Sequence, residues 1–256
     1  MHERRTFFFT LCLCISTCLL TIPAFGITLL DEFSKAKEGD FAVFEQQKQI
    51  TLFRIAKKTD KEMTIEEVTA TAKPADLNWQ AWLTKGAPTH TSWTLSRFDL
   101  TTGTIESIYS YGTNEWIQTD STGNATFTFL PTLFTLPLVA VAENDRKRIG
   151  PPPESDEHDR RKLWVPKAIF QGKAHLVPFY VFRVEWPKDV TELSGKAIYL
   201  YIPYSKENQS GKFENNDCLN YFPYWVEVVG KISKVKLRVI DSGKNLTSPA
   251  TLPTLQ

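Results

Sequence analysis

The sequence contains few cysteines and no excess of charge of either sign. Three of its four cysteines lie in the first eighteen residues, so a chain shortened at the N-terminus keeps only Cys218 and can form no internal disulfide. Lysine and arginine number 30, and aspartate and glutamate 29. A nucleic-acid groove needs a basic excess, which this composition excludes. Hydrophobic residues make up 42% of the 256 residues, which excludes disorder along the whole length.

Catalytic and metal-binding motifs are also missing. The sequence has no G-x-S-x-G elbow, no P-loop, no H-E-x-x-H and no C-x-x-C. His90, His158 and His175 are too scattered to predict a metal site. His90 precedes Ser92, but no orienting acid or oxyanion feature accompanies the pair. We therefore predict no catalytic residues, no metal and no cofactor, and a hydrolase is the least favoured interpretation.

Residues 1–26 have the order of a secretory signal peptide. Two arginines precede an apolar run at 7–22, and Ala24-Phe25-Gly26 supplies small residues at the cleavage positions. The run is short for a membrane-spanning helix. We expect cleavage after Gly26 and export to a bacterial periplasm, which a single remaining cysteine fits. In a second interpretation Cys18 becomes lipidated and anchors the protein to the envelope.

Beyond the signal peptide, β-branched and aromatic runs separated by polar turns predict a β-rich protein. Helical spacing of apolar residues predicts short helices at 28–37 and 75–84. The expected strands lie within 41–56, 63–71, 93–100, 104–111, 164–170, 175–186, 197–202, 224–229 and 235–240, with another beginning at Trp116. The predicted fold class is mainly β, with a curved antiparallel sheet or half-open barrel covered by short helices.

Two segments interrupt this pattern. Residues 127–142 are the most apolar stretch of the mature chain, and two prolines cut it into pieces suited to a buried strand and a covering helix or loop. Residues 143–162 are highly charged and predict a solvated loop, interpreted as an excursion from one sheet rather than as a linker. We expect a single β-rich domain over 27–244, with this insertion, and a flexible tail at 245–256.

Several predicted strands carry large apolar side chains on both faces, and two interpretations stay open. Either the sheet packs on both sides and the aromatic residues are core, or it encloses an apolar cavity suited to an acyl chain or a hydrophobic peptide. The residues expected to line such a cavity, or to cover it, are Phe179, Val181, Tyr199, Tyr201, Trp225, Leu133, Phe134 and Leu136.

The order of elements resembles the outer-membrane lipoprotein-sorting carriers of Gram-negative bacteria, the LolA/LolB-like group. The resemblance rests on a short N-terminal helix and a meander, followed by a D-x-x-T-G turn at 99–103. It also rests on the apolar stretch at 130–142 and on the strand Phe222-Pro223-Tyr224-Trp225-Val226-Glu227-Val228. It implies a half-open antiparallel barrel that binds the acyl chains of lipoproteins.

The expected function is therefore an exported envelope protein that binds or carries an apolar ligand or a lipoprotein inside a curved sheet, without bond chemistry. The alternative is a structural or interaction protein with a filled barrel and no ligand, which binds an envelope protein through 143–162. In both cases we expect a monomer. A cavity of about 300 Å³ or more inside the sheet would favour the first interpretation.

Overall fold

The computed structural model describes residues 27–46, 49–118, 132–154, 159–189, 192–204, 218–229 and 234–253. Residues 1–26 lie outside this part of the chain, so the expected cleavage at Gly26 and lipidation at Cys18 stay predictions.

Within the described residues, eleven strands form one sheet, and every strand pair is antiparallel. The strand order is β6-β5-β4-β3-β2-β1-β13-β12-β11-β10-β7, and β8 and β9 form a separate hairpin. The strands are β1 Phe41–Gln46, β2 Gln49–Lys58, β3 Glu62–Ala70, β4 His90–Asp99, β5 Ile105–Ser110, β6 Glu115–Gln118, β7 Val139–Ala140, β8 Ala168–Phe170, β9 Lys173–His175, β10 Phe179–Glu185, β11 Ala197–Pro203, β12 Trp225–Val229 and β13 Lys234–Gly243. The helices are α1 Leu29–Phe33, α2 Trp79–Thr84 and the 3-10 helix η1 Glu143–Asp145.

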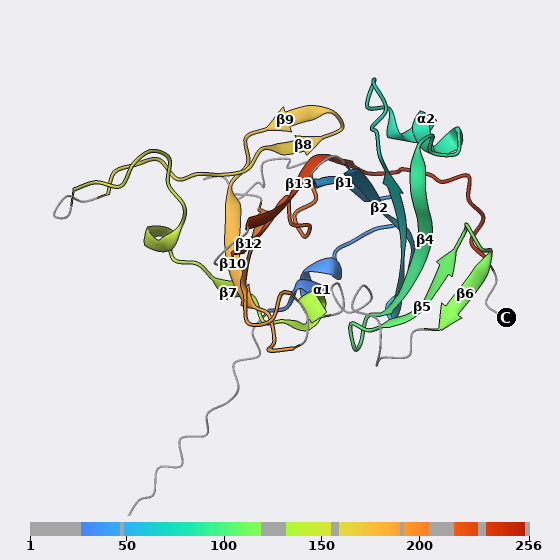
Figure 1. The fold of residues 1–256 in the computed structure, drawn as a ribbon, viewed down its shortest axis with the longest axis horizontal. Coiled ribbons are helices and arrows are strands. Elements are labelled where there is room, and N and C mark those ends of the chain that lie inside the picture. The colour runs from blue at the N-terminus through green and yellow to red at the C-terminus, as the bar shows by residue number, and fades with distance from the viewer. Residues whose placement is uncertain are drawn as a thin grey trace, which may run out of the picture.

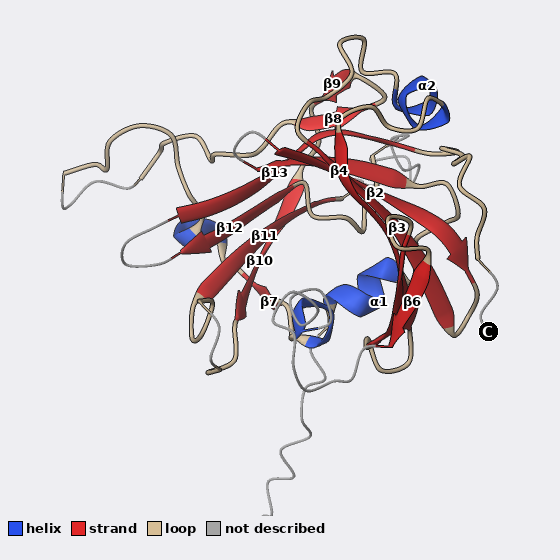
Figure 2. Cartoon of the chain, turned by 45° about the vertical axis from the view of Figure 1, so that its right-hand side comes forward, coloured by secondary structure: helices blue, strands red, loops and turns tan. Residues whose placement is uncertain are grey.

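The sheet is strongly curved and wraps around α1, whereas α2 lies on its outer side (Figures 1 and 2). In the described part, β6 and β7 are the two edges and do not pair with each other. The predicted fold class, a curved antiparallel sheet covered by short helices, is confirmed.

The inner, concave face is covered by the protein's own aromatic side chains. Phe33 of α1 lies 4.9 Å, between ring centroids, from Phe134, which belongs to the helical turn at 132–135. Phe33 also lies 5.3 Å from Phe222, which lies 5.3 Å from Phe44 of β1. Phe134 in turn lies 5.3 Å from Phe98 of β4. We call Phe44, Phe222, Phe33, Phe134 and Phe98 the phenylalanine chain; it links β1 to β4 across the concave side.

The outer face has a second core beneath α2. Trp79, Trp82 and Leu83 are buried there against residues of β1 and β2 that include Val43 and Leu52. The α2 helix begins later than predicted because Leu77 has a positive φ of 53°, outside the helical region, and Asn78 caps the first turn by accepting from the Ala81 N–H. This core closes the face of the sheet opposite to α1.

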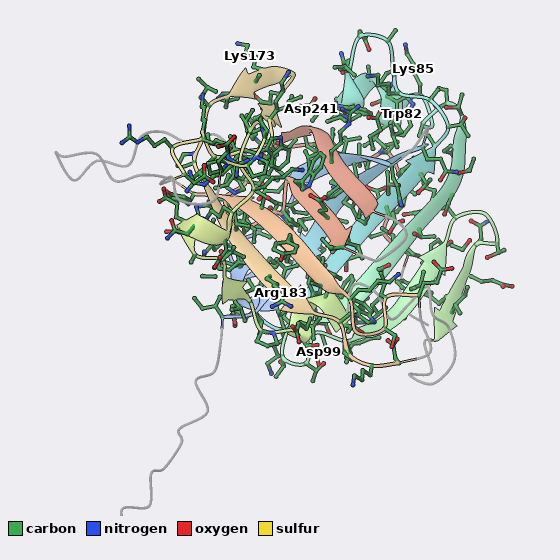
Figure 3. All side chains as sticks on the ribbon, turned by 60° about the vertical axis from the view of Figure 1, so that its left-hand side comes forward. Trp82, Lys85, Asp99, Lys173, Arg183 and Asp241 are labelled. Atoms are coloured by element: carbon green, nitrogen blue, oxygen red, sulfur yellow. The ribbon has the colours of Figure 1, made fainter. Side chains whose placement is uncertain are left out.

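Asp241 of β13 ties the outer elements together. Its carboxylate is 2% exposed and accepts from the Trp79 indole N–H at 2.7 Å and from the Gly172 N–H at 2.9 Å. Figure 3 shows Asp241 between the β8–β9 hairpin, which carries Lys173, and α2, which carries Trp82. Both bonds go to an ionised acceptor, the stronger class of hydrogen bond.

The beginning of the expected flexible tail is anchored on the outer face. Leu246 is 4% exposed, and its N–H donates to the Gly39 carbonyl at 2.9 Å. Farther along, the Tyr111 hydroxyl donates to the Thr251 carbonyl at 3.0 Å. Residues 246 and 251 are thus tied to the body of the molecule by hydrogen bonds with a backbone carbonyl and with a tyrosine hydroxyl.

This C-terminal segment seals a buried ion pair. Arg54 Nε donates to Glu66 Oε2 at 2.6 Å, and the two residues are 8% and 0% exposed. The other carboxylate oxygen accepts from the Trp93 indole N–H at 2.8 Å and from Ser248 Oγ at 2.7 Å. Glu66 is thus satisfied by groups from β2, from β4 and from the C-terminal segment.

Removing this carboxylate should destabilise the fold strongly. We expect Glu66→Ala to lower the free energy of unfolding by about 3–5 kcal/mol, because Arg54 stays buried without its partner. Urea denaturation followed by tryptophan fluorescence measures the change. The control is Glu185→Ala, which breaks an ion pair whose carboxylate side chain is 70% exposed and should cost at most about 1 kcal/mol. Equal losses in the two variants would contradict the role of the pair.

Candidate functional site

The strand register places five of the predicted lining residues on the outer face of the sheet. Val181 of β10 stands opposite Tyr201 of β11, which stands opposite Trp225 of β12. Phe179 and Tyr199 alternate into the same face of their strands. The register continues this face from β12 through β13 and β1 to β2 and β3, where α2 packs on it.

The predicted cover residues lie on the opposite side. Leu133 and Phe134 are buried in the inner core, and Leu136 packs against it. By strand register the two groups stand on opposite faces of the sheet. All eight residues nevertheless belong to, or pack against, one hydrophobic cluster. The period-two alternation of β11 could have predicted this difference. Ile198, Leu200 and Ile202 face inward, so Tyr199 and Tyr201 face outward.

Trp164, which was predicted to begin a strand, instead covers two of the outer residues. Its ring centroid lies 5.3 Å from that of Tyr201 and 5.1 Å from that of Trp225, both in edge-to-face geometry. Such pairs stabilise beyond the area they bury. We call Trp164, Tyr201 and Trp225 the aromatic box.

A buried carboxylate and a lysine accompany the aromatic box. Glu227 follows Trp225 on the same face and is 6% exposed, and the Trp225 indole N–H lies 3.4 Å from its Oε2. Lys147 Nζ lies 3.8 Å from the same oxygen and 4.6 Å from the centroid of the Trp164 ring. A cation over a tryptophan face is a favourable cation–π arrangement. The site therefore combines three rings, the Glu227 carboxylate and the Lys147 ammonium. The positive charge of Arg146, whose Nε donates to the Val141 carbonyl at 3.1 Å, also acts on Tyr201.

The pKa of Tyr201 reflects this environment. Burial raises it to about 12, and the negative charge of Glu227 adds to the rise. Both effects disfavour the phenolate. The hydroxyl of Tyr201 is thus a neutral group throughout the physiological range.

The charged insertion is folded back on itself where it meets the box. The Trp164 N–H donates to the Lys147 carbonyl at 2.8 Å, and the Ile149 N–H donates to the Lys162 carbonyl at 2.9 Å. We call residues 147–154 and 159–164 the ribbon; these residues project from the body of the molecule on the side of β10 (Figure 1). The chain leaves the sheet after β7 and re-enters it at β10, the strand that pairs with β7.

Two salt bridges within the ribbon hold its legs. Asp159 Oδ2 lies 2.8 Å from Arg161 Nη2 and 3.5 Å from Arg148 Nε. The pKa of Asp159 is lowered to about 2, mainly by its hydrogen bonds with Arg161. The Arg148 guanidinium also donates to the Arg161 carbonyl at 2.6 Å. Some charged groups of this segment are thus paired with one another. The sequence predicts only a solvated loop here and does not reveal these ion pairs.

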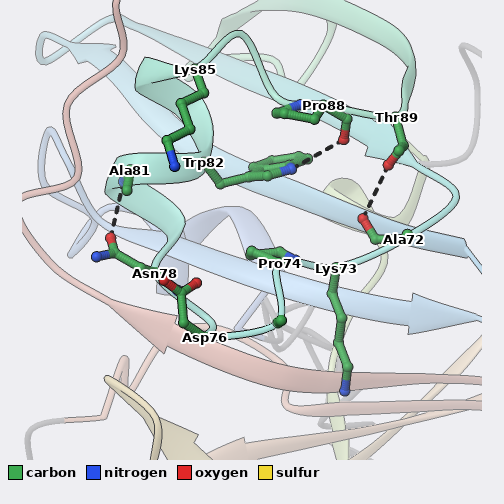
Figure 4. Close-up of a pocket in the computed structure, with 11 residues that line it drawn as sticks. Ala72, Lys73, Pro74, Asp76, Asn78, Ala81, Trp82, Lys85, Pro88 and Thr89 are labelled. Atoms are coloured by element: carbon green, nitrogen blue, oxygen red, sulfur yellow. Dashed lines mark hydrogen bonds between the residues drawn. The ribbon is translucent and has the colours of Figure 1, made fainter.

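A groove lies beside α2. It has a volume of about 400 Å³ and is lined by residues 72–76, 78, 81, 82, 85, 88 and 89. Figure 4 shows the Trp82 ring between Pro74 and Pro88, with the indole N–H donating to the Pro88 carbonyl at 3.2 Å. A second cavity of about 330 Å³ lies between α1 and the turns at 58–60 and 100–101. Neither is lined by any of the eight predicted residues.

The described residues contain no group of three or more histidine, cysteine, aspartate or glutamate side chains placed to hold a metal ion. His90 lies edge-on to Trp93, with ring centroids 5.7 Å apart, and its Nδ1 is 3.0 Å from the Ala87 carbonyl oxygen. Cys218 is buried and forms no disulfide. In the part of the chain that the structure describes, no helix is both long and apolar enough to cross a membrane.

Comparisons with known proteins bear on family and fold. A protein-family model described as CT021 protein matches residues 51–175. The solved structure of the hypothetical protein CT021 from Chlamydia trachomatis is similar, with a TM-score of 0.60 and 18% sequence identity, over 90% of this chain and 98% of that chain. At this identity the likeness shows the fold alone. No curated protein matches the chain.

The expected resemblance to lipoprotein-sorting carriers is wrong, because the family model that matches is that of CT021. The D-x-x-T-G motif has a local explanation instead. Asp99 Oδ1 accepts from the Thr101 N–H at 2.6 Å, and Gly103 has a φ of 72°. An aspartate that caps a turn and a glycine with positive φ are what many β-hairpins need, so the motif reports turn chemistry rather than ancestry.

The raised pKa of Tyr201 predicts a pH dependence of stability. The unfolded phenol ionises near its ordinary pKa of about 10, whereas the folded one stays neutral up to about 12. The stabilisation is complete below pH 10 and is lost as the pH rises from about 10 to about 12. We expect the urea midpoint to fall less steeply over this range in Tyr201→Phe than in the wild type. Tyr180→Phe, at a half-exposed position of β10, controls for loss of a phenol, and parallel curves for all three proteins would contradict the assignment.

Proposed function

We propose that this protein is an exported, non-catalytic interaction protein, whose concave side is filled by its own side chains and whose outer surface binds a protein partner. The partner site comprises the ribbon and the neighbouring aromatic box. Of the two interpretations left open by the sequence, the packing of the inner face favours the filled one.

The phenylalanine chain is the observation that carries this proposal. An acyl chain inside the sheet would need the space between α1 and the strands, where Phe33, Phe134 and Phe222 pack against one another. Phe33 and Phe134 are 3% and 1% exposed. Displacing a buried phenylalanine costs about 1.5–3 kcal/mol of lost burial for each side chain. Ligand entry would therefore have to offset the loss of the protein's own core.

The outer surface has what a partner site needs. Ile149 and Val165, at the ends of the two ribbon legs, are 53% and 48% exposed. Val165 directly follows Trp164 of the aromatic box, and the Ile149 N–H donates to the Lys162 carbonyl within the ribbon. Aromatic residues with a polar surround are typical of interface centres. Export through a signal peptide at 1–26 is part of the proposal and would place this surface in the envelope.

Native mass spectrometry of residues 27–256, purified from the envelope of the producing cell, tests the filled interior. We expect the mass of the bare polypeptide before and after delipidation, and no uptake of added fatty acid or phospholipid. Phe134→Ala is the matched variant, because removal of this ring opens an apolar cavity that should admit a small hydrophobic probe such as benzene. A lipid that copurifies with the wild type and is lost on delipidation would overturn the filled interior and favour the carrier.

Site-specific photo-crosslinking in the producing cells tests the outer surface. A photoreactive residue at Ile149 of the ribbon should give a discrete crosslinked species. The same residue at Ile117 of β6, on the far edge of the sheet and similarly exposed at 45%, should not. Crosslinking at Ile117 alone, or at neither position, would contradict a partner site at the ribbon.

A further inference from the structure

We propose that the aromatic box and Glu227 form a receptor for an arginine side chain of the partner, and that Lys147 occupies this receptor in the unbound protein. The inference rests on the proposed function, since it takes the partner to be a protein. It names the chemical group that the outer surface recognises.

The buried carboxylate is the first reason to expect a cationic ligand. Glu227 is 6% exposed, and an ionised group at such a depth needs a counter-charge and hydrogen bonds. The Lys147 ammonium lies 3.8 Å from Oε2, beyond the 2.7–2.9 Å typical of a charge-assisted hydrogen bond. Lys147 therefore supplies charge to Oε2, which also accepts from the Trp225 indole N–H at 3.4 Å, without a short hydrogen bond of its own. The strand register also places Lys236 of β13 opposite Glu227, so the test below includes a substitution there.

The three rings are the second reason. Trp164 presents a face to the ammonium group, with Nζ 4.6 Å from the ring centroid, and Tyr201 and Trp225 hold Trp164 edge-on. A planar guanidinium can stack on such a face and donate two parallel hydrogen bonds to a carboxylate, which a lysine ammonium cannot do. The arrangement of ring and carboxylate therefore suits arginine better than the lysine that lies there.

Lys147 can leave without unfolding its surroundings. Its side chain is 44% exposed, so it has solvent on one side. Its backbone stays fixed, because the Trp164 N–H donates to the Lys147 carbonyl. Only the four-carbon side chain has to rotate outward, and Trp164 keeps its place over Tyr201 and Trp225. The lysine thus competes with an incoming guanidinium for one position.

Titration of the mature protein with Nα-acetyl-arginine methylamide tests the receptor. The readout is the shift of the Trp164 and Trp225 indole N–H signals in NMR spectra. We expect Lys147→Ala to bind this probe at least tenfold more tightly than the wild type, because the competing lysine side chain is removed. The matched ligand control is Nα-acetyl-citrulline methylamide, which has nearly the same shape without the charge and should not bind.

Two further variants assign the binding to the carboxylate. Adding Glu227→Gln to Lys147→Ala should abolish the gain, whereas adding Lys236→Ala should leave it in place. If Glu227→Gln prevents folding, Lys147→Met replaces it as the test: this variant keeps the aliphatic stem over Trp164 without the charge, and it should bind the probe less tightly than Lys147→Ala. Equal binding of both ligands, or equal affinity in the wild type and in Lys147→Ala, would overturn the receptor.

The two proposals fail in distinguishable ways. A crosslinked partner at Ile149 together with no gain of arginine binding in Lys147→Ala would remove the receptor and leave the interaction protein standing. Arginine binding without any crosslinked species at Ile149 would leave the receptor standing and contradict the partner site.

Discussion

An open, curved sheet with an apolar inner face has to find a cover, and this constraint organises the molecule. In the described residues the two edge strands, β6 and β7, do not meet, so the sheet cannot cover its concave side by closing on itself. The cover comes from three places far apart in the chain: α1, the turn at 132–135 and the segment at 218–224. Phe33, Phe134 and Phe222 are the anchors of these three pieces and pack against one another as well as against the strands. The concave side is therefore covered by a hydrophobic core of buried, mutually packed side chains.

The outer face is built differently, from polar anchors set among apolar residues. Glu66, Asp241 and Glu227 are each buried, and each accepts a hydrogen bond from a tryptophan indole N–H. A tryptophan can cover apolar surface and still satisfy a carboxylate at its polar edge. This pairing accounts for Trp79, Trp93 and Trp225, three of the seven tryptophans. It also lets covering segments with little regular structure be held in defined positions.

The sequence was informative where side-chain periodicity dominates and misleading where tertiary contacts decide. Alternating β-branched and aromatic residues identified most strands, and the helix containing Trp79 and Trp82 was found, although Leu77 delays its start. Which face a residue such as Tyr201 occupies depends on the register of its neighbours, and a run apolar on both faces carries little of that information. The sequence around Trp164 predicts a strand, because no local pattern indicates that Trp164 packs on Tyr201 of β11. The family resemblance failed because a capped turn at Asp99 is common to many hairpins.

The central strand pair has a consequence for how the protein forms. The strand β1 lies between β2 and β13, so the middle of the sheet joins Phe41 to Gly243, near the two ends of the part of the chain that the structure describes. Contacts so distant in sequence carry a large loop-closure entropy and make folding slow. A chain that crosses a membrane N-terminus first would have its β1–β6 half outside with an unpaired edge at β1 until β13 emerges. During that interval the half-sheet would expose a pairing-competent strand and be vulnerable to aggregation.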